Sequence, residues 1–179
     1  LFRSPWQPEG LWEDSGTQHA YEMDSGDALH RRSLYTFWRR TCPPPLLSAF
    51  DAPSREFCLV QREESLTPLQ TLAVLNDKGF LEAARALATK VQAGGAADDS
   101  AAVRSAFLRA TGHLPSQAQL QALATLLAEA ITYYQAHPGE TAALLSSAGP
   151  PAGSPSPRTA ALMVVCRALF SSEEFLRTW

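Results

Sequence analysis

A run of arginines interleaved with aromatic residues is the densest group of side chains in this sequence that could do chemistry. Six of the 15 basic residues lie between residues 31 and 62, and all six are arginine. Arginine binds carboxylate, sulfate or phosphate through paired N–H donors and stacks on aromatic faces, and a flat ring beside it suits the C–H face of a sugar. The pattern predicts an anion- or glycan-binding surface. Its candidate residues are His30, Arg31, Arg32, Tyr35, Trp38, Arg39, Arg40, Asp51 and Arg55.

The same arginines have a second interpretation, in which they pair with acidic neighbours inside this part of the chain. Residues 1–65 hold 7 basic and 10 acidic groups, so partners are plentiful. Such pairs would hold together a region that has little regular backbone hydrogen bonding. Because of these numbers, internal pairing is the first expectation and ligand binding the second. The acidic candidates are Asp24, Asp27, Asp51 and Glu56.

Catalytic signatures of the common enzyme classes do not occur in the sequence. It contains no glycine-rich nucleotide-binding motif, no G-x-S-x-G nucleophile elbow and no H-E-x-x-H zinc motif. The four histidines form no pair at ligand spacing, and the adjacent carboxylates at 63–64 and 98–99 lie at predicted element ends, where they suit the helix dipole. The sequence therefore identifies no catalytic residue and predicts neither a metal site nor a cofactor in this chain.

The three cysteines, Cys42, Cys58 and Cys166, do not have the C-x-x-C spacing of a zinc ribbon. One disulfide, Cys42–Cys58, is compatible with the sequence. Three buried thiols that pack as small apolar side chains are the favoured alternative.

The composition changes near residue 65, and this change predicts how the chain is organised. Of the 16 aromatic residues, 9 lie in residues 1–65, whereas 25 of the 29 alanines follow residue 65. Alanine favours helices and aromatic residues favour strands and irregular packed segments. We therefore predict a mainly α fold in which residues 66–179 form a bundle of five or six helices. This bundle is expected to pack, as one compact unit, on an irregular segment, residues 1–65, with short strands at 33–38 and 57–60.

Helix boundaries in the second part are marked by local signals. Helices are predicted at 68–76, 78–93, 99–111, 117–137 and 140–146, and a last helix is predicted to break and restart near Ser171, where S-S-E-E has capping-box spacing. The predicted caps and terminators are Thr67, Asp77, Gly94, Gly112 and Ser116.

Charge and hydropathy exclude two further classes. The sequence has 15 basic against 18 acidic residues, which argues against a general electrostatic grip on nucleic acid. No stretch approaches 18 consecutive apolar residues, so no membrane span is predicted. The chain begins at Leu1 without a signal-peptide pattern, which is typical of a fragment or a processed product.

Several blocks of sequence, above all R-R-S-L-Y-T-F-W at 31–38 and T-P-L-Q…L-N-D at 67–77, resemble one family. The chain resembles the C-terminal planctomycete-type (PSD-type) domain of unknown function, which occurs in large proteins that often carry a cytochrome-c-like domain. The further blocks that carry the resemblance are residues 5–12, 43–44, 50–56, 80–85, 106–112 and 169–176.

The resemblance implies a context rather than an activity. It implies that the chain is the C-terminal portion of a longer exported protein, periplasmic or on the cell surface, whose other domains are its partners. Any haem would lie in the separate cytochrome-like domain, since this chain contains no C-x-x-C-H. The family offers no established catalytic residues to carry over.

Three functions remain open from the sequence. The first is a non-catalytic module that supports its companion domains and binds polysaccharide or anionic glycan through the arginine–tryptophan region. The second is part of an extracellular carbohydrate-active enzyme whose site is completed elsewhere, with Asp51, Arg55 and His30 as contributors. The third is an assembly or surface-structural element.

Overall fold

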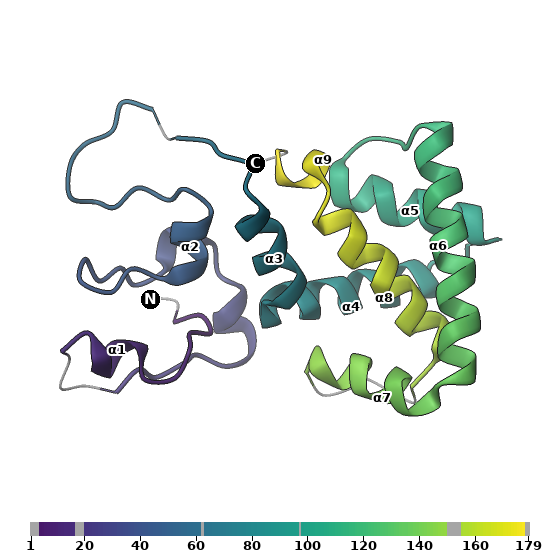
Figure 1. Ribbon diagram of the computed structural model, residues 1–179, viewed down its shortest axis with the longest axis horizontal. Coiled ribbons are helices and arrows are strands. Elements are labelled where there is room, and N and C mark those ends of the chain that lie inside the picture. The colour runs from purple at the N-terminus through teal and green to yellow at the C-terminus, as the bar shows by residue number, and fades with distance from the viewer. Residues whose placement is uncertain (1–3, 17–19, 62, 97, 150–154, 178–179) are drawn as a thin grey trace. The chain divides into compact units, whose positions relative to one another are not determined.

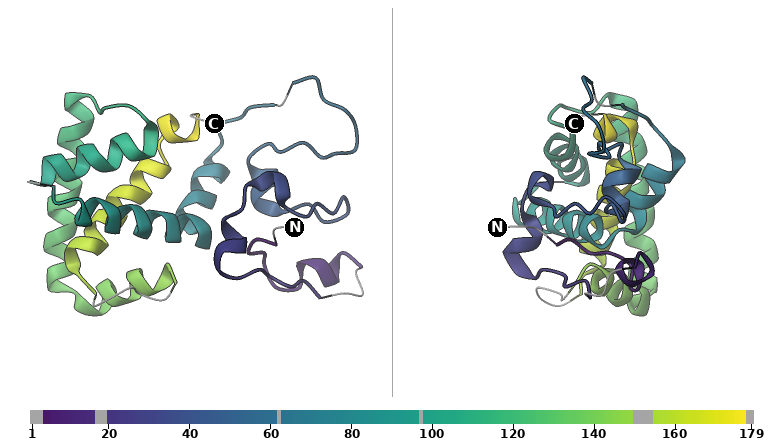
Figure 2. Two further views of the ribbon diagram at one scale, coloured as in Figure 1. Left: turned by 180° about the vertical axis from the view of Figure 1, so that it is seen from behind. Right: turned by 90° about the vertical axis from the view of Figure 1, so that its left-hand side faces the viewer.

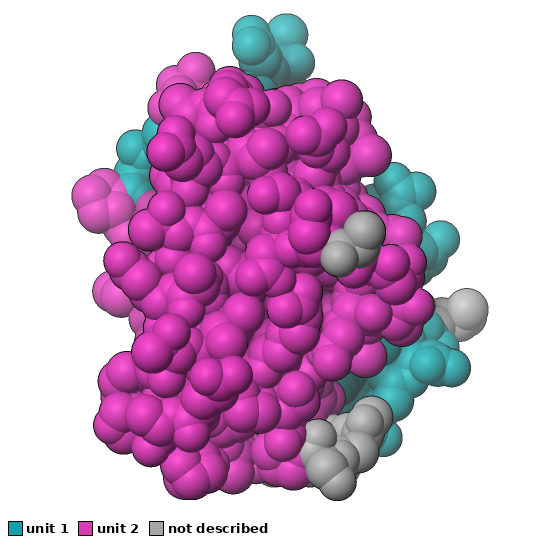
Figure 3. Space-filling view, turned by 90° about the vertical axis from the view of Figure 1, so that its right-hand side faces the viewer, with its two compact units in different colours: residues 1–67 teal, residues 68–179 magenta. Residues whose placement is uncertain are grey.

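A computed structural model gives the fold of the chain (Figure 1). It describes residues 4–16, 20–61, 63–96, 98–149 and 155–177. The chain divides into two compact units, Leu1–Thr67 and Pro68–Trp179 (Figure 3). The predicted mainly helical fold is confirmed. That the helical bundle packs on the N-terminal segment stays a prediction.

The first unit consists of short helical turns joined by irregular segments. Around Trp12 the aromatic rings of Tyr21 and Phe37 lie 5.0 and 5.8 Å away, centroid to centroid. Ser4 and Asp24 fasten two distant stretches, because each backbone N–H is bonded to the other residue, at 2.7 and 3.0 Å. The elements are α1 (Leu11–Asp14), the 3-10 helices η1 (Gly26–His30) and η2 (Ser33–Tyr35), and α2 (Pro45–Ala49).

The two strands predicted in this unit are wrong. Residues 33–35 form a 3-10 turn, in which Tyr35 N–H donates to the Arg32 carbonyl and Thr36 N–H to the Ser33 carbonyl. Residues 57–60 lie in an irregular stretch without strand pairing. Aromatic and β-branched residues favour strands because they pack well on a pleated surface. In the part of the chain that the structure describes, neither segment forms a strand, and within 33–38 Thr36 alone lies in an isolated bridge.

The second unit is a helical bundle whose elements follow the predicted order. Its longest helices are α6, α4 and α8, and short α9 closes the unit. The elements are α3 (Pro68–Asn76), α4 (Lys78–Ala93), α5 (Asp99–Thr111), α6 (Gln117–Ala136), α7 (Pro138–Ser147), α8 (Pro157–Phe170) and α9 (Glu173–Leu176).

Four of the five residues predicted to start or end these helices do so: Asp77, Gly94, Gly112 and Ser116. The Asp77 carboxylate accepts the N–H groups of Gly79 and Phe80 at the start of α4. Ser116 forms a complete capping box with Gln119 at the start of α6. Helix α5 ends at Gly112, whose φ of 81° lies in the left-handed region that favours glycine.

The restart after the last long helix begins one residue later than predicted. Ser171 is the C-cap of α8, and Ser172 is the residue whose side chain accepts the N–H of Phe175 to start α9. Ser171 and Ser172 could each cap the next helix, but Ser171 ends α8, so Ser172 is the N-cap of α9.

Helix α8 lies at the centre of the second unit, with α4, α5, α6 and α7 packed around it (Figures 1 and 2). It is apolar on nearly all sides, which is the pattern of a helix surrounded by others. Ala160 and Ala161 are fully buried and allow close approach of the neighbouring helices. Leu162, Val165, Cys166, Leu169 and Phe170 of this helix are all buried.

Two arginines of the second unit donate hydrogen bonds to carbonyl groups at the C-terminal ends of other helices. Arg85 on α4 donates from Nη1 to the carbonyl of Gly149 at 2.7 Å and to that of Leu145 at 3.3 Å, at the end of α7. Arg167 on α8 donates from Nη2 to the carbonyl of Leu75, at the end of α3, at 2.9 Å. The last carbonyls of a helix have no partner within it and carry partial negative charge, so a guanidinium there satisfies both needs.

All three cysteines are free, so no disulfide joins Cys42 to Cys58. The prediction of three buried thiols holds for Cys42 and Cys166 and is wrong for Cys58, which is exposed. Cys58 lies in a stretch, residues 57–61, whose side chains are all exposed although most of them are apolar. An apolar neighbourhood in the sequence therefore did not predict burial here. Burial raises the pKa of the Cys166 thiol to about 12.

Candidate functional site

Trp38 and Arg55 form the central pair of the predicted anion-binding surface. The guanidinium carbon of Arg55 lies 5.2 Å from the centre of the Trp38 ring, within the range of a cation–π contact. The Trp38 indole N–H donates to the carbonyl of Ser54 at 3.1 Å. These two contacts bring together the end of the η2 region and the stretch after α2.

The backbone around Arg55 is held in an unusual conformation. Arg55 and Asp51 have φ values of 63° and 56°, in the left-handed region that non-glycine residues rarely adopt. The Asp51 carboxylate accepts the N–H of Ser65 at 2.8 Å and its hydroxyl at 2.7 Å. Asp51 therefore closes the stretch 51–65 into a loop.

Arg39 forms a second arginine–tryptophan contact, with a partner that the sequence analysis did not name. Its guanidinium carbon lies 5.6 Å from the centre of the Trp12 ring. Its Nη1 donates to Ser15 Oγ at 3.1 Å, and that hydroxyl donates to the Trp12 carbonyl. Trp12 and Arg39 are half-buried. The only sequence signal for Trp12 was its being a tryptophan in an irregular segment.

The remaining candidates lie on the surface of the same unit. They are exposed, and His30 and Tyr35 end the two 3-10 helices. Among the contacts of the described residues, none joins His30, Arg32 or Arg40 to the Trp38–Arg55 pair. The exposed candidates are His30, Arg31, Arg32, Tyr35, Arg40 and Arg55.

Internal pairing of the arginines, the first expectation, is not seen for four of them. In the described ranges the ion pairs are Arg158–Asp99 and Arg177–Glu173, both in the second unit. None involves Arg32, Arg39, Arg40 or Arg55. Two of the expected acidic partners have other bonds, since Asp24 accepts the N–H of Ser4 and Asp51 accepts Ser65.

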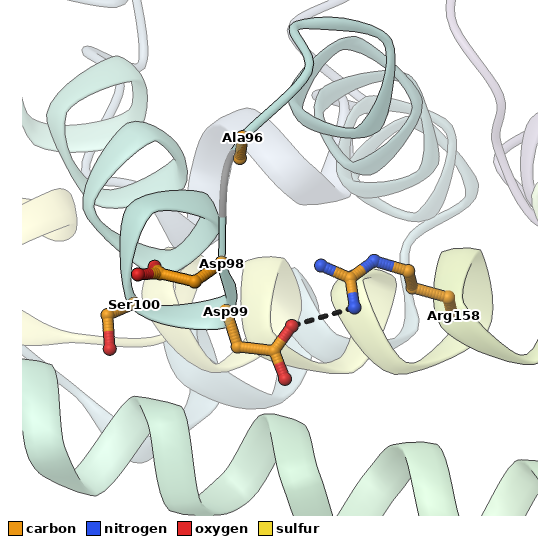
Figure 4. Close-up of a pocket in the computed structure, with 5 residues that line it drawn as sticks. All are labelled: Ala96, Asp98, Asp99, Ser100 and Arg158. Carbon is orange, nitrogen blue, oxygen red and sulfur yellow. Dashed lines mark ion pairs between the residues drawn. The ribbon is translucent and has the colours of Figure 1, made fainter.

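A shallow depression lies in the second unit (Figure 4). It is lined by Ala96, Asp98, Asp99, Ser100 and Arg158. Asp99 points toward Arg158 and is bonded to it at 2.7 Å, while the Asp98 carboxylate caps α5 by accepting the N–H of Ala101. Its charged groups thus already serve the fold, and we assign no ligand to it.

A tyrosine–glutamate pair at the α6–α7 corner is one polar cluster that the sequence analysis did not predict. Tyr133 donates its hydroxyl to the Glu140 carboxylate at 2.5 Å, and its ring stacks on His137 at 4.3 Å. The hydrogen bond to Glu140 is the main cause that raises the pKa of Tyr133, with smaller contributions from desolvation and from the charge of Glu140. Tyr133 lies near the end of α6, and it contacts His137 just before Pro138 and Glu140 just after it. The cluster therefore fixes the corner between α6 and α7.

Two further features of the structure bear on the predicted classes. Within the described ranges, no group of three or more His, Cys, Asp or Glu side chains is placed to hold a metal ion. No helix there has both the length and the apolar character needed to cross a membrane.

The sequence model of one family, PSD1, described as "Protein of unknown function (DUF1553)", matches residues 3–127. The match covers more than half of the chain. The chain belongs to the PSD1 family. No curated protein and no solved structure matches it. The matched part contains the candidate residues of the arginine–aromatic surface, which lie between residues 30 and 55, together with α3 to α5, so it includes residues of both units.

Proposed function

We propose that this PSD1 chain is a non-catalytic binding module of a larger exported protein, and that it contacts anionic glycan through its arginine–aromatic surface. The observation that carries the proposal is the Trp38–Arg55 pair, in which an exposed guanidinium lies over an indole ring and has no carboxylate partner among the described residues. The other domains of the parent protein are its expected partners, and this context comes from the family resemblance.

The chemistry of the pair suits a sulfated or carboxylated sugar. A guanidinium that rests on a ring face keeps its N–H edges available for a bidentate bond to carboxylate or sulfate. The bond from the Trp38 indole to Ser54 fixes the ring, and the Asp51–Ser65 closure limits the freedom of the loop that carries Arg55. Less side-chain entropy is then lost when a ligand binds.

The geometry supports binding over catalysis. The enzyme hypothesis needed Asp51, Arg55 and His30 around one reacting group. The Asp51 carboxylate is already engaged by two donors of Ser65, and no contact among the described residues links His30 to Arg55. A general acid or base must lie within hydrogen-bond reach of the substrate proton that it transfers, and the described contacts do not bring these three residues around one such position.

A thermal-shift panel with neutral, carboxylated and sulfated oligosaccharides at two salt concentrations tests the proposal. A ligand present at 100 times its Kd stabilises the folded state by about 2.7 kcal/mol. We expect a shift with the anionic sugars only, and a smaller one at high salt, because salt screens exposed charges.

Substitutions locate the binding surface. Arg55→Ala should weaken the binding of the sulfated sugar by about tenfold, in line with loss of a charged hydrogen bond. Trp38→Ala should have a similar effect, because it removes the ring on which Arg55 rests. Arg104→Ala, which removes an exposed arginine of α5, is the matched control and should bind normally. Equal losses for all three variants, or no shift with any sugar, would refute the proposed function.

A further inference from the structure

A second arginine–tryptophan contact begins one residue along the chain from the Trp38–Arg55 pair. The guanidinium carbon of Arg39 lies 5.6 Å from the centre of the Trp12 ring, close to the 5.2 Å between Arg55 and the Trp38 ring. Neither guanidinium has a carboxylate partner among the described residues. The first unit therefore contains the same chemistry twice, built on two different tryptophans.

Three consecutive side chains of this segment turn alternately to different neighbours. The Phe37 ring lies 5.8 Å from the Trp12 ring, and Arg39 contacts the same ring. Trp38, which stands between them in the sequence, contacts Arg55 instead. This alternation is that of extended backbone, in which successive side chains point to opposite sides. The two arginine–tryptophan pairs therefore lie on opposite sides of the segment.

Arg39 can bind an anion in the same way as Arg55. Its Nη1 donates to Ser15 Oγ at 3.1 Å, and its other guanidinium nitrogens have no partner among the described residues. The Trp12 ring and the bond to Ser15 hold the guanidinium in place, so less side-chain freedom is lost when a ligand binds. Arg39 is also half-buried, and the attraction between opposite charges grows as the surrounding dielectric falls.

We propose that the chain has two separate anion sites, one at Trp38–Arg55 and one at Trp12–Arg39, and that it joins two strands of an anionic polysaccharide. One sulfate or carboxylate group cannot contact both guanidinium groups, because the backbone of the segment lies between them. The ligand is therefore a polyanionic glycan, and the module cross-links it. This inference rests on the proposed function and adds Arg39 and Trp12 as a second site.

Titration calorimetry of the intact chain with sucrose octasulfate, a fully sulfated disaccharide, tests the number of sites. We expect two probe molecules per unaltered chain. Arg39→Ala and Arg55→Ala should each leave one bound probe molecule, and the double variant should leave none. Arg104→Ala, which removes an exposed arginine of α5, is the matched control and should keep both sites.

The site that remains in each variant reports on its folding. Arg39→Ala should bind the remaining probe molecule with unchanged affinity, because the Trp38–Arg55 pair is intact. Arg39→Gln keeps an N–H donor for Ser15 and removes the charge, so it should lose the same site with less disturbance of the packing around Trp12.

Light scattering with dextran sulfate tests whether the two sites join separate strands. The unaltered chain should raise the scattering above that of the polymer alone, because each molecule connects two strands. Arg39→Ala and Arg55→Ala should still sediment with the polymer but should not raise its scattering. High salt should abolish the increase for the unaltered chain, because salt screens exposed charges.

One bound probe molecule per unaltered chain, lost in Arg55→Ala and kept in Arg39→Ala, would overturn the second site and leave the proposed function standing. Cross-linking of dextran sulfate that survives both single substitutions would also overturn it, since one site would then be enough. No binding of sucrose octasulfate or of any other anionic sugar would refute the proposed function, and the second site with it.

Discussion

At the scale of single residues, polar side chains act mainly by completing backbone groups that the fold leaves unpaired. Arg85, Arg167 and Asp51 each bond to backbone atoms of a segment distant in the sequence. Arginine suits this role because its planar group offers several donors in fixed directions. The arginines of the first unit differ, since Arg55 and Arg39 rest on tryptophan rings and have no carboxylate partner among the described residues.

The Arg85 bond to the end of α7 should contribute measurably to stability. Arg85→Ala leaves the carbonyls of Gly149 and Leu145 without this donor, so we expect the free energy of unfolding to fall by about 1–3 kcal/mol. Arg104→Ala, at an exposed position of α5, should change it by less than about 0.5 kcal/mol. Urea unfolding followed by circular dichroism measures both. Equal values for the two variants would show that the contact contributes nothing.

The buried thiol of Cys166 predicts a pH dependence. Its pKa is raised from 9.0 to about 12 in the folded chain, so the folded state holds its proton where the unfolded state begins to lose it. The stabilising contribution is therefore complete below pH 9 and is lost as pH rises from about 9 to about 12. Cys166→Ala should flatten the fall in stability over that interval, as measured by urea unfolding at pH 8, 9 and 10. A profile identical to that of the unaltered chain would contradict the assignment.

The same contrast in burial predicts thiol reactivity. The thiolate is the nucleophile, so a buried thiol with a raised pKa reacts slowly. At pH 8 an alkylating reagent should modify exposed Cys58 in the native chain, while Cys166 should react only after unfolding. Mass spectrometry of tryptic peptides distinguishes the two sites. Equal labelling of both in the native chain would argue against the buried position of Cys166.

At the scale of elements, one side chain links the start of α6 to the last helix. Gln119 accepts the N–H of Ser116 with its amide oxygen, and its amide nitrogen donates to the Glu174 carboxylate of α9 at 2.6 Å. A double-mutant cycle with Gln119→Ala and Glu174→Ala should therefore show a coupling energy of about 0.5 kcal/mol or more. The pair Ser116→Ala and Arg177→Ala, which share no contact in the structure, is the control and should be additive. Additivity in both cycles would mean that α9 is held by its apolar contacts alone.

The elements also show what a sequence can predict. The starts of α4 and α6 follow from Asp77 and Ser116, because a capping side chain acts on N–H groups two or three residues away. The strands at 33–38 and 57–60 could not be judged in this way, since a strand depends on a partner strand that can be distant in the sequence. Residue types identified Trp38 and Arg55 as candidates, but their contact depends on a loop closed by Asp51 and Ser65, 14 residues apart. The Arg39–Trp12 contact depends on residues 27 positions apart, and the Tyr133–Glu140 bond spans the corner between two helices, so neither pairing could be read from a local pattern.

At the scale of the whole molecule, the two units differ in how much core they contain. Among the described residues, the apolar side chains that are fully buried lie in the second unit, with Cys42 as the exception. Burial of apolar surface is the main favourable contribution to folding, and it must exceed the loss of chain entropy. A unit of fewer than about 70 residues with so small a core falls in the range where folding needs additional support.

This difference predicts that residues 68–179 fold alone and that residues 1–67 do not. The fragment 68–179 keeps α8 and the helices packed around it, so it should show a helical circular dichroism spectrum and a cooperative melt. The fragment 1–67 should show neither a cooperative melt nor protection of its amides from hydrogen exchange. In the intact chain, amides of α8 should exchange most slowly, because opening them requires the whole bundle to open. A non-cooperative melt of 68–179 would mean that the bundle needs the first unit for its stability, and the arginine–aromatic surface would then belong to a single cooperative domain.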